Sequence, residues 1–283
     1  NGQDAPWASD GGVTVTTLVF VHAHPDDESS QTAGSMAMAV DRGYRVVVVY
    51  ATNGDLGVAP DDLAVGETVP DRRRREAEAA AQVIGLQEIY WLGYRDSGMT
   101  GWPQNADPRC LWQAPVDEAA GRLAAVLDRE QPAVLIGYDD HGGYGHPDHR
   151  RVHQITYRAA ELAAGRPDVL EESMNRDAMR RRIKRGLAAG VPGVDASQLD
   201  LRGDDGQLVG TPEAELNWRV NLPQEYLARK RAAMTCHASQ TSDVGYFLSL
   251  PPEQFAAWFA SECYRRAGTP GPMLEGWPFP AAA

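Results

Sequence analysis

The sequence predicts a doubly wound α/β fold, in which helices cover both faces of a mostly parallel sheet. Short, apolar runs rich in β-branched residues occur at 17–22, 45–52, 88–92 and 133–138. They alternate with helix-like segments at 29–41, 71–84, 115–129 and 147–164. Strands that are apolar along their whole length are typical of a sheet buried on both sides, and helices of this length commonly connect parallel strands.

The helix ends and the loops of this first half agree with the alternation. Gly43 and Gly85 follow the first two helical segments, where a glycine commonly ends a helix. Long loops follow two of the strands, at 53–70 and 94–114. Loops at the carboxyl ends of parallel strands form the ligand-binding edge of open α/β folds, so we expect both loops beside the functional site.

The second half is less regular and is expected to be a C-terminal elaboration that shapes the cleft. Its pattern predicts a strand at 169–175, a basic helix at 176–186, a polar loop at 191–211, a strand at 218–222, a helix at 223–237, a short strand at 246–250 and a last helix at 252–265. No linker separates the two halves. We therefore expect one domain over 13–283, with its α/β core at 13–168, a cleft-shaping part at 169–283 and a loose N-terminal arm at 1–12.

Composition and charge argue against several classes of partner. The 283 residues are 43% hydrophobic and 23% charged, with a formal net charge of −12. A nucleic-acid partner is not expected, because phosphate binding needs a clustered positive surface. The three cysteines show no CxxC spacing, so they suggest neither a disulfide framework nor a thiolate zinc site. No apolar run reaches the length of a membrane span, and residues 1–12 lack the regions of a signal peptide, so a cytoplasmic location is expected.

The seven histidines are unevenly distributed along the chain. Two close the first strand, four lie in the loop and helix after the fourth strand, and one is near the C-terminus: His22, His24, His141, His146, His149, His153 and His237. A parallel sheet places the carboxyl ends of its strands on one edge. The first two groups of histidines are therefore expected to lie close together.

The first group belongs to the sequence HAHPDDE at 22–28, in a turn between a strand and a helix. Its carboxylates suit the positive end of the following helix, and together with imidazole they form a ligand set suited to zinc. Helix capping is the alternative for one or two of the acidic residues. Capping does not account for His24, which precedes the proline.

The second group belongs to HGGYGHPDH at 141–149, again between a strand and a helix. Three glycines in four positions allow the backbone to approach a ligand closely, and Pro147 suits the first turn of a helix. This arrangement places His149 on the opening turn, directed toward the sheet edge. A site formed by His149 and His153, four residues apart, is the alternative, although no glutamate follows His149 as it does in HExxH enzymes.

Together, HAHPDDE and GGYGHPDH resemble the motifs of the LmbE/PIG-L-like zinc N-deacetylases. Within that family the chain is most similar to the mycothiol-pathway deacetylases and mycothiol S-conjugate amidases of actinomycetes. The resemblance covers most of 17–157 and returns in RRRREAEAAAQVIG (72–85), GYRDSGM (93–99), SMNRD (173–177) and KRAAMTCHASQ (230–240). It implies a Rossmann-like α/β fold, in agreement with the pattern of strands and helices.

The resemblance also implies how a metal is bound. His24, Asp27 and His149 would hold one Zn²⁺ per chain, and Asp26 would be the general base. Three protein ligands leave zinc an open position for water, whose pKa falls to about 7 there. Asp26 is adjacent to a ligand in sequence, so it can take a proton from that water without binding the metal.

Other residues of the second motif are assigned in the same way. His146 would stabilise the developing charge or protonate the leaving amine, and Tyr144 would donate a hydrogen bond to the oxyanion. Asp148 is expected either to orient His146 or His149 as a hydrogen-bond acceptor or to cap the helix. His22 is expected to pack near the site without binding the metal.

Several further residues are candidates for substrate binding. Four consecutive arginines at 72–75 oppose the helix dipole; they form either a solvated face or a run from which one arginine enters the cleft. The candidates for substrate contacts are Arg75, Glu76, Arg95, Asp96, Ser97 and His237. For His237, as for Gln240, a packing role is the alternative.

The predicted activity is zinc-dependent hydrolysis of an amide. The first candidate reaction is N-deacetylation of a small molecule or natural product that contains N-acetylglucosamine. The expected partner is therefore such an amino-sugar conjugate. Cleavage of a larger amide, such as a mycothiol S-conjugate, is the alternative on the same metal site. A non-catalytic sugar-binding module would not need an acidic base, and a dinucleotide enzyme would need a GxGxxG turn where this chain has HPDDE.

Overall fold

The computed structural model of the chain describes residues 15–191, 194–203, 205–241, 244–269 and 271–282. The expected N-terminal arm, residues 1–12, lies outside these ranges. The described residues build one sheet with the strand order β3-β2-β1-β4-β5-β7-β6-β8. The strands are β1 (Thr17–His22), β2 (Arg45–Thr52), β3 (Glu88–Tyr94), β4 (Val134–Tyr138), β5 (Asp168–Ser173), β6 (Trp218–Asn221), β7 (Ser261–Arg265) and β8 (Leu274–Glu275).

The first five strands are parallel, and β1 lies between β2 and β4. All six residues of β1 are buried, as expected for a strand covered on both faces. The pairing with β5 and β6 makes β7 the antiparallel strand of the sheet. The predicted mostly parallel α/β fold is confirmed, and the sheet runs through both halves of the chain.

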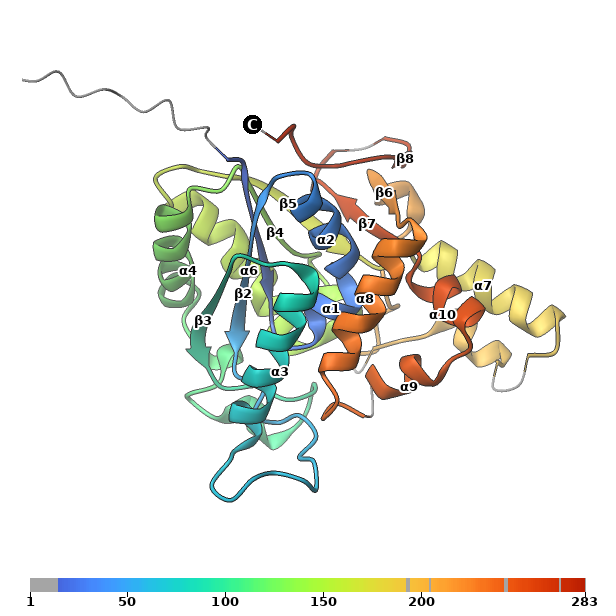
Figure 1. Cartoon of the computed structure of the whole chain (residues 1–283), viewed down its shortest axis with the longest axis horizontal. Coiled ribbons are helices and arrows are strands. Elements are labelled where there is room, and N and C mark those ends of the chain that lie inside the picture. Colours follow the sequence, from blue (N-terminus) through green and yellow to red (C-terminus); the bar gives the residue numbers. More distant parts are fainter. Residues whose placement is uncertain (1–14, 192–193, 204, 242–243, 270, 283) are drawn as a thin grey trace, which may run out of the picture.

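Helices cover both faces of this sheet (Figure 1). They are α1 (Asp27–Gln31), α2 (Ala33–Asp41), α3 (Val69–Ile84), α4 (Val116–Glu130), α5 (Gly142–Gly145), α6 (Pro147–Leu162), α7 (Arg176–Ala188), α8 (Gln224–Cys236), α9 (Val244–Ser249) and α10 (Pro252–Phe259), with 3-10 turns η1 (Pro103–Ala106), η2 (Leu111–Gln113), η3 (Ala196–Asp200) and η4 (Glu213–Glu215). One hydrophobic core packs α4 and α6 on the sheet. The other packs α2, α3, α8 and α10 on the opposite face.

The second half differs from its prediction at two elements. The apolar run predicted as a strand at 246–250 belongs to helix α9, because a short apolar run alone does not distinguish a buried helix from a strand. The helix predicted at 252–265 ends at Phe259, and Ser261–Arg265 is strand β7. The pairing of β7 with β5 joins residues about ninety positions apart, which a local pattern cannot reveal. In the first half, the helix predicted at 29–41 is interrupted at Thr32.

Candidate active site

The two histidine motifs meet at one edge of the sheet. Strands β1 and β4 are parallel neighbours, so the chain leaves the sheet after His22 and after Tyr138 on the same side. A cavity of about 780 Å³ lies there. Both motifs contribute to its lining, together with a residue of the loop after β3: His24, Asp26, Asp27, Tyr144, His146 and Asp96. His149 is fully buried and contacts Asp27.

The turn after β1 holds Asp26 in a conformation that few side chains adopt. Its φ is 121°, a positive value that is unusual outside glycine and is found at strained functional sites. The Asp26 N–H donates to Glu28 Oε2 at 2.9 Å. The Asp26 side chain makes no capping hydrogen bond to α1 and lines the cavity instead. Capping therefore does not explain why Asp26 is acidic.

The donor atoms of three residues converge beside this turn. Asp27 Oδ2 lies 3.4 Å from His24 Nδ1 and 3.3 Å from His149 Nε2. Two ligands held about 2.1 Å from one zinc ion in a tetrahedral arrangement are about 3.4 Å apart. Both distances join a histidine to Asp27 Oδ2, and each fits two ligands of one zinc ion. Among the described residues, the group whose ligand atoms all lie within 4.8 Å of one another contains His24 and His149 with His146, but not Asp27.

The remaining ring nitrogens agree with that fit. His149 Nδ1 contacts the Gly142 carbonyl oxygen at 3.2 Å, and His24 Nε2 contacts Asp148 Oδ2 at 3.1 Å. A ring that donates through that nitrogen can offer its other nitrogen to a metal ion once that nitrogen carries no proton. Burial opposes the charge on His24, but Asp96 and the hydrogen bond to Asp148 raise the pKa of His24 well above its usual value, so metal binding there would displace a proton. His149 Nε2 is buried and, within the described part of the chain, has no hydrogen-bond partner. A buried acceptor without a donor is costly, and a metal ion would satisfy it.

Tyr138, the last residue of β4, supports this site and was not identified from the sequence. Its hydroxyl donates to Asp27 Oδ2 at 2.9 Å and accepts from the Ala23 N–H at 3.0 Å. Its ring stacks on His149 at 4.2 Å between centroids. Burial, followed by the charge of Asp27, raises the pKa of Tyr138 well above its usual value, so the hydroxyl remains a donor. The one available signal was an aromatic residue closing an otherwise aliphatic strand.

His146 lies close to the same donors but is arranged differently. Its ring centroid is 4.6 Å from that of His24 and 5.1 Å from that of His149, and the three histidines form a possible metal-binding group by distance alone. However, His146 Nδ1 accepts from the Asp148 N–H at 3.1 Å. Burial, aided by repulsion from the two other histidines, lowers the pKa of His146 well below its usual value. The ring is therefore neutral, with its proton on Nε2.

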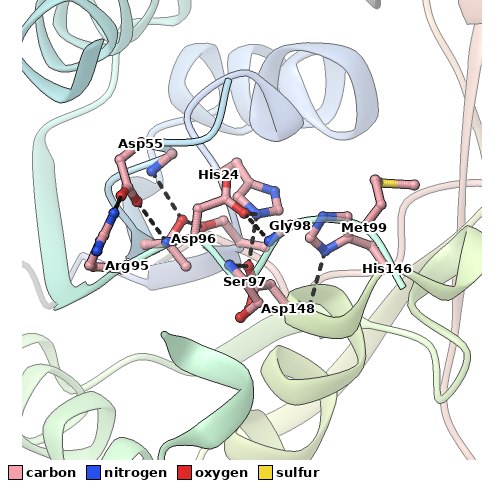
Figure 2. A network of polar contacts seen from close by, with 12 residues as sticks. His24, Asp55, Arg95, Asp96, Ser97, Gly98, Met99, His146 and Asp148 are labelled. Carbon is pink, nitrogen blue, oxygen red and sulfur yellow. Dashed lines mark hydrogen bonds and ion pairs between the residues drawn. The ribbon is translucent and has the colours of Figure 1, made fainter. Parts of the chain in front are cut away.

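Asp148 of α6 and Asp96 of the loop after β3 both contact the His24 ring (Figure 2). Asp148 Oδ2 accepts from His24 and from the Ser97 N–H at 2.9 Å, so Asp148 orients His24 and not a histidine of its own motif. Asp96 Oδ1 lies 3.5 Å from His24 Nε2 and accepts from the Gly98 N–H. A second group of close donors, formed by these residues and His146, is thus already engaged in hydrogen bonds.

Of the candidates for substrate contacts in this loop, only Asp96 lines the cavity. Ser97 is buried, and its hydroxyl donates to Asp148. Arg95 forms ion pairs with Asp55 and Asp107 at 2.6 and 2.8 Å. Figure 2 shows Arg95 directed away from His24 and His146. Ser97 and Arg95 therefore shape the loop and are not brought to the cavity.

From the arginine run, the structure brings Arg73 and not Arg75 into the cavity. Arg73 Nη2 lies 3.2 Å from Asp26 Oδ2, and its Nη1 donates to the Gly54 carbonyl at 2.9 Å. The side chain of Arg75 is 61% exposed and pairs with Glu67. The one signal in the sequence for this choice was the glycine at position 54. A Cβ on Gly54 would lie 2.5 Å from the Arg73 guanidinium, so glycine leaves the space that Arg73 occupies.

Two further candidates for substrate contacts, Glu76 and His237, bond to other residues of the protein instead. The buried carboxylate of Glu76 accepts from the Ser239 N–H and hydroxyl. His237 is buried and contacts Glu28 Oε1 at 2.7 Å. Neither lines the cavity. His237 thus fixes the turn that carries Asp26, since Glu28 also accepts the Asp26 N–H.

The histidines assigned to packing are satisfied by the protein. His22 Nε2 lies 2.8 Å from Thr32 Oγ1, and His153 Nδ1 lies 3.1 Å from the Tyr138 carbonyl oxygen. Burial lowers the pKa of His22 to about 4. Neither residue belongs to a possible metal-binding group among the residues that were placed.

Comparison with known proteins gives a consistent result. Residues 19–160 match the family described as PIG-L: GlcNAc-PI de-N-acetylase. Curated proteins named 1D-myo-inositol 2-acetamido-2-deoxy-alpha-D-glucopyranoside deacetylase are similar over most of their length. The protein from Nocardiopsis dassonvillei is 38% identical over 91% of this chain and 96% of its own, and that from Thermobispora bispora is 34% identical over 92% and 91%.

A solved structure shares the fold. The N,N'-diacetylchitobiose deacetylase from Pyrococcus horikoshii superimposes with a TM-score of 0.56 at 21% identity, over 89% of this chain and 84% of that one. No helix in the described ranges has the length and apolar character needed to cross a membrane.

Proposed function

Because the chain belongs to the PIG-L family of amide-hydrolysing deacetylases, we propose that it removes the acetyl group from an N-acetylglucosamine unit of a small-molecule conjugate at a zinc ion. The observation that carries this proposal is the contact of Asp27 Oδ2 with both His24 Nδ1 and His149 Nε2, next to a cavity that the Asp26 carboxylate lines. The relatives named as deacetylases of an acetamido-glucosyl inositol support the amino-sugar part of the proposal.

Zinc would be held by His24, Asp27 and His149. When bound, it supplies a Lewis acid that polarises the amide carbonyl and lowers the pKa of water to about 7. The protein prepares these ligands before any metal arrives. The Tyr138 hydroxyl and the backbone N–H of His24 both donate to Asp27 Oδ2 and fix the carboxylate. The Gly142 carbonyl and the Asp148 carboxylate fix the rings of His149 and His24.

Asp26 would be the general base. Burial, opposed by the charge of Arg73, raises the pKa of Asp26 to about 6, and a base is most effective when its pKa is near the working pH. Asp26 takes one proton from the attacking water while the water oxygen bonds to the acyl carbon. The ion pair with Arg73 keeps the carboxylate aimed into the cavity.

Tyr144 and His146 would complete the reaction. Both line the cavity, where the Tyr144 hydroxyl can donate to the carbonyl oxygen as charge develops on it. The neutral His146 ring presents its Nε2–H to the same developing charge. The carbon–nitrogen bond then breaks, the nitrogen receives the proton that Asp26 holds, and acetic acid and a free amine leave. The acid then loses its proton to solvent and becomes acetate.

Cleavage of a larger amide remains the second candidate, and the size of the cavity favours it. The cavity volume of about 780 Å³ lies in the upper part of the range of small-molecule sites. Both reactions release the same amine, so the acid that is released distinguishes them.

The test combines metal content and turnover. We expect about one zinc per chain by mass spectrometry and acetate release from N-acetylglucosaminyl-inositol or a related glycoside. Asp26→Asn keeps the shape and the three ligands, so zinc content should be unchanged while kcat falls by about 100-fold or more. Asp27→Asn is the matched control, because it should lower zinc content as well. A wild-type protein without zinc, or an Asp26→Asn variant with full activity, would disprove the mechanism.

A further inference from the structure

The cavity has a second end, far from the two motifs in sequence, that the proposed chemistry does not use. This end is formed by residues after β5, by α7 and by the C-terminal helices α9 and α10. Its walls are largely apolar and aromatic: Met174, Met179, Phe247, Trp258 and Phe259. A deacetylase needs no such surface to hold an acetyl group and one sugar ring. The end is therefore available to the part of the substrate beyond the amino sugar.

Two cations lie against these apolar side chains: Lys230, which is paired with Glu262, and Arg182. Its guanidinium carbon lies 4.3 Å from the centroid of the Trp258 ring, so the two planar groups are in contact. Its Nε is buried and, in the part of the chain that the structure describes, finds no hydrogen-bond acceptor. Among the described residues, the charge that acts on it is that of Arg185, which is of the same sign.

The other basic residues of α7 are either paired or, like Lys184 and Arg185, exposed. Arg180 pairs with Asp200 at 2.5 Å, Arg181 pairs with Glu213, and Arg176 donates to backbone carbonyls such as that of Val209. In a chain with a net charge of −12, a half-buried guanidinium that pairs with no carboxylate of the described residues is unusual. Burial without a counter-ion lowers the pKa of Arg182 to about 10, which still leaves it charged.

The remaining charged groups of the cavity are already engaged. Lys230 donates to Glu262 at 2.6 Å, Arg73 pairs with Asp26, and Arg202 donates to the Gly206 carbonyl at 2.7 Å. Glu172 lines the same cavity, but burial and the charges of Asp139, Asp27, Lys230 and Glu262 together shift its pKa upward, and Arg182 is not among these influences. Because no carboxylate in the described ranges pairs with Arg182, we expect a bound anion to be its partner.

We propose that Arg182 and the apolar wall around Trp258 form a subsite for an acidic aglycone, that is, a carboxylate or phosphate borne on an aryl or alkyl group of the substrate. This inference rests on the proposed deacetylation and names its substrate class. Stacking on Trp258 orients the planar guanidinium so that its Nη edge can bind an anion with two parallel hydrogen bonds. The apolar walls bind the group that carries the acid.

The test uses a matched series of N-acetylglucosaminides with aryl aglycones. The aryl group is unsubstituted or bears a carboxylate, a phosphate or an ammonium group, each with a short and a long spacer. The zinc-loaded wild-type protein should show a kcat/KM at least about 10-fold higher for one acidic glycoside than for the neutral one. The ammonium glycoside should fall below the neutral one. The carboxylate and phosphate arms show which acid the subsite prefers.

Three variants test whether Arg182 causes the preference for an acidic glycoside. Arg182→Gln should abolish it while changing turnover of the neutral glycoside by less than about 3-fold, and Arg182→Lys should retain part of it. Lys184→Gln, an equal loss of charge at an exposed position of the same helix, should leave it unchanged. Equal turnover of acidic and neutral glycosides, or a preference that survives in Arg182→Gln, overturns the subsite and leaves deacetylation intact.

A binding measurement separates this inference from the proposed function. If no glycoside of the series is hydrolysed, the proposed function is lost. Calorimetric titration of the aryl ligands then decides the subsite alone. Tighter binding of an acidic ligand to wild-type protein than to Arg182→Gln supports the subsite, and equal binding overturns it.

Discussion

Single atoms decide whether His24 and His149 can bind a metal ion. In each ring one nitrogen donates to an acceptor of the protein, and the other faces Asp27 Oδ2. The acceptor for His149 is a backbone carbonyl, which no substitution of a side chain removes. The acceptor for His24 is the carboxylate of Asp148, which can be changed while the ligand itself is kept.

Asp148→Asn should therefore weaken metal binding without removing a ligand. The variant loses the charge that holds His24 Nε2–H, and loss of such a supporting partner typically lowers metal affinity 10- to 100-fold. The measurement is zinc affinity by competition with a chromophoric chelator, with kcat at saturating zinc determined alongside. Ser239→Ala is the control, since Ser239 bonds to Glu76 behind the site and should leave zinc affinity unchanged. An Asp148→Asn affinity equal to that of wild type would contradict this role.

At the scale of elements, the glycine-rich turn α5 positions the first turn of α6. Gly142 has a φ of 65°, and a Cβ added there would lie 2.5 Å from His149 Cβ and 2.9 Å from the Arg150 backbone nitrogen. The backbone of the turn thus occupies space that any side chain would need. Its carbonyl is also the acceptor for His149.

Gly142→Ala should displace His149 and lower both zinc content and turnover, by about 10-fold or more. Gly190→Ala is the matched control, because Gly190 has a similar φ of 64° but nothing within 4 Å of an added Cβ. Backbone strain is then comparable in the two variants, and only crowding differs. Zinc content by mass spectrometry and acetate release are the measurements. Similar losses in both variants would show that strain, not the position of His149, is responsible.

Helix α2, helix α8 and strand β7 are joined by one buried carboxylate. Glu262 accepts from the backbone N–H groups of Gly34 and Ser35 at 2.9 and 2.7 Å, and from Lys230 Nζ at 2.6 Å. Glu262 and Lys230 are both almost fully buried. Removing one member of a buried ion pair leaves the other uncompensated.

Glu262→Gln should accordingly lower the free energy of unfolding by about 3 kcal/mol. Glu275→Gln removes the same charge from an exposed ion pair with Arg219 and should cost less than about 1 kcal/mol. Urea denaturation followed by circular dichroism measures both. If the two substitutions lower the free energy of unfolding equally, the buried pair does not stabilise the packing of these elements.

At the scale of the whole molecule, the two halves of the sequence share one core. Leu18 and Phe20 of β1 belong to the same hydrophobic cluster as Val220, Phe255 and Tyr264 of the second half. Strand β7 also extends the parallel sheet directly from β5. We propose on these grounds that residues 13–283 fold as one domain.

Unfolding should therefore be a single cooperative transition. Far-ultraviolet circular dichroism and tryptophan fluorescence should give the same urea midpoint, because Trp91 lies in the first half and Trp218 and Trp258 in the second. The experiment is repeated with a chelator, so that loss of metal is not mistaken for unfolding of a part. A fluorescence transition at lower urea than the dichroism transition would indicate two units.

The local sequence pattern determined the fold class and the location of the site. Apolar runs alternating with helices specify a parallel sheet, since burial on both faces leaves no polar alternation. The two motifs follow β1 and β4, and topology alone then brings them to one edge. The assignment of roles to Asp26 and His146 came from resemblance to a family, because spacing does not separate a ligand from a base.

What only the tertiary structure decided depends on contacts between residues distant in sequence. Tyr138 bonds to Asp27 across 111 positions, and the ring of His24 is held by Asp148 across 124. Arg73 enters the cavity, out of four adjacent arginines, because Gly54 approaches it closely. The membership of Ser261–Arg265 in the sheet depends on its pairing with β5. Local periodicity reports burial, whereas these choices depend on which side chain finds a partner once the chain is packed.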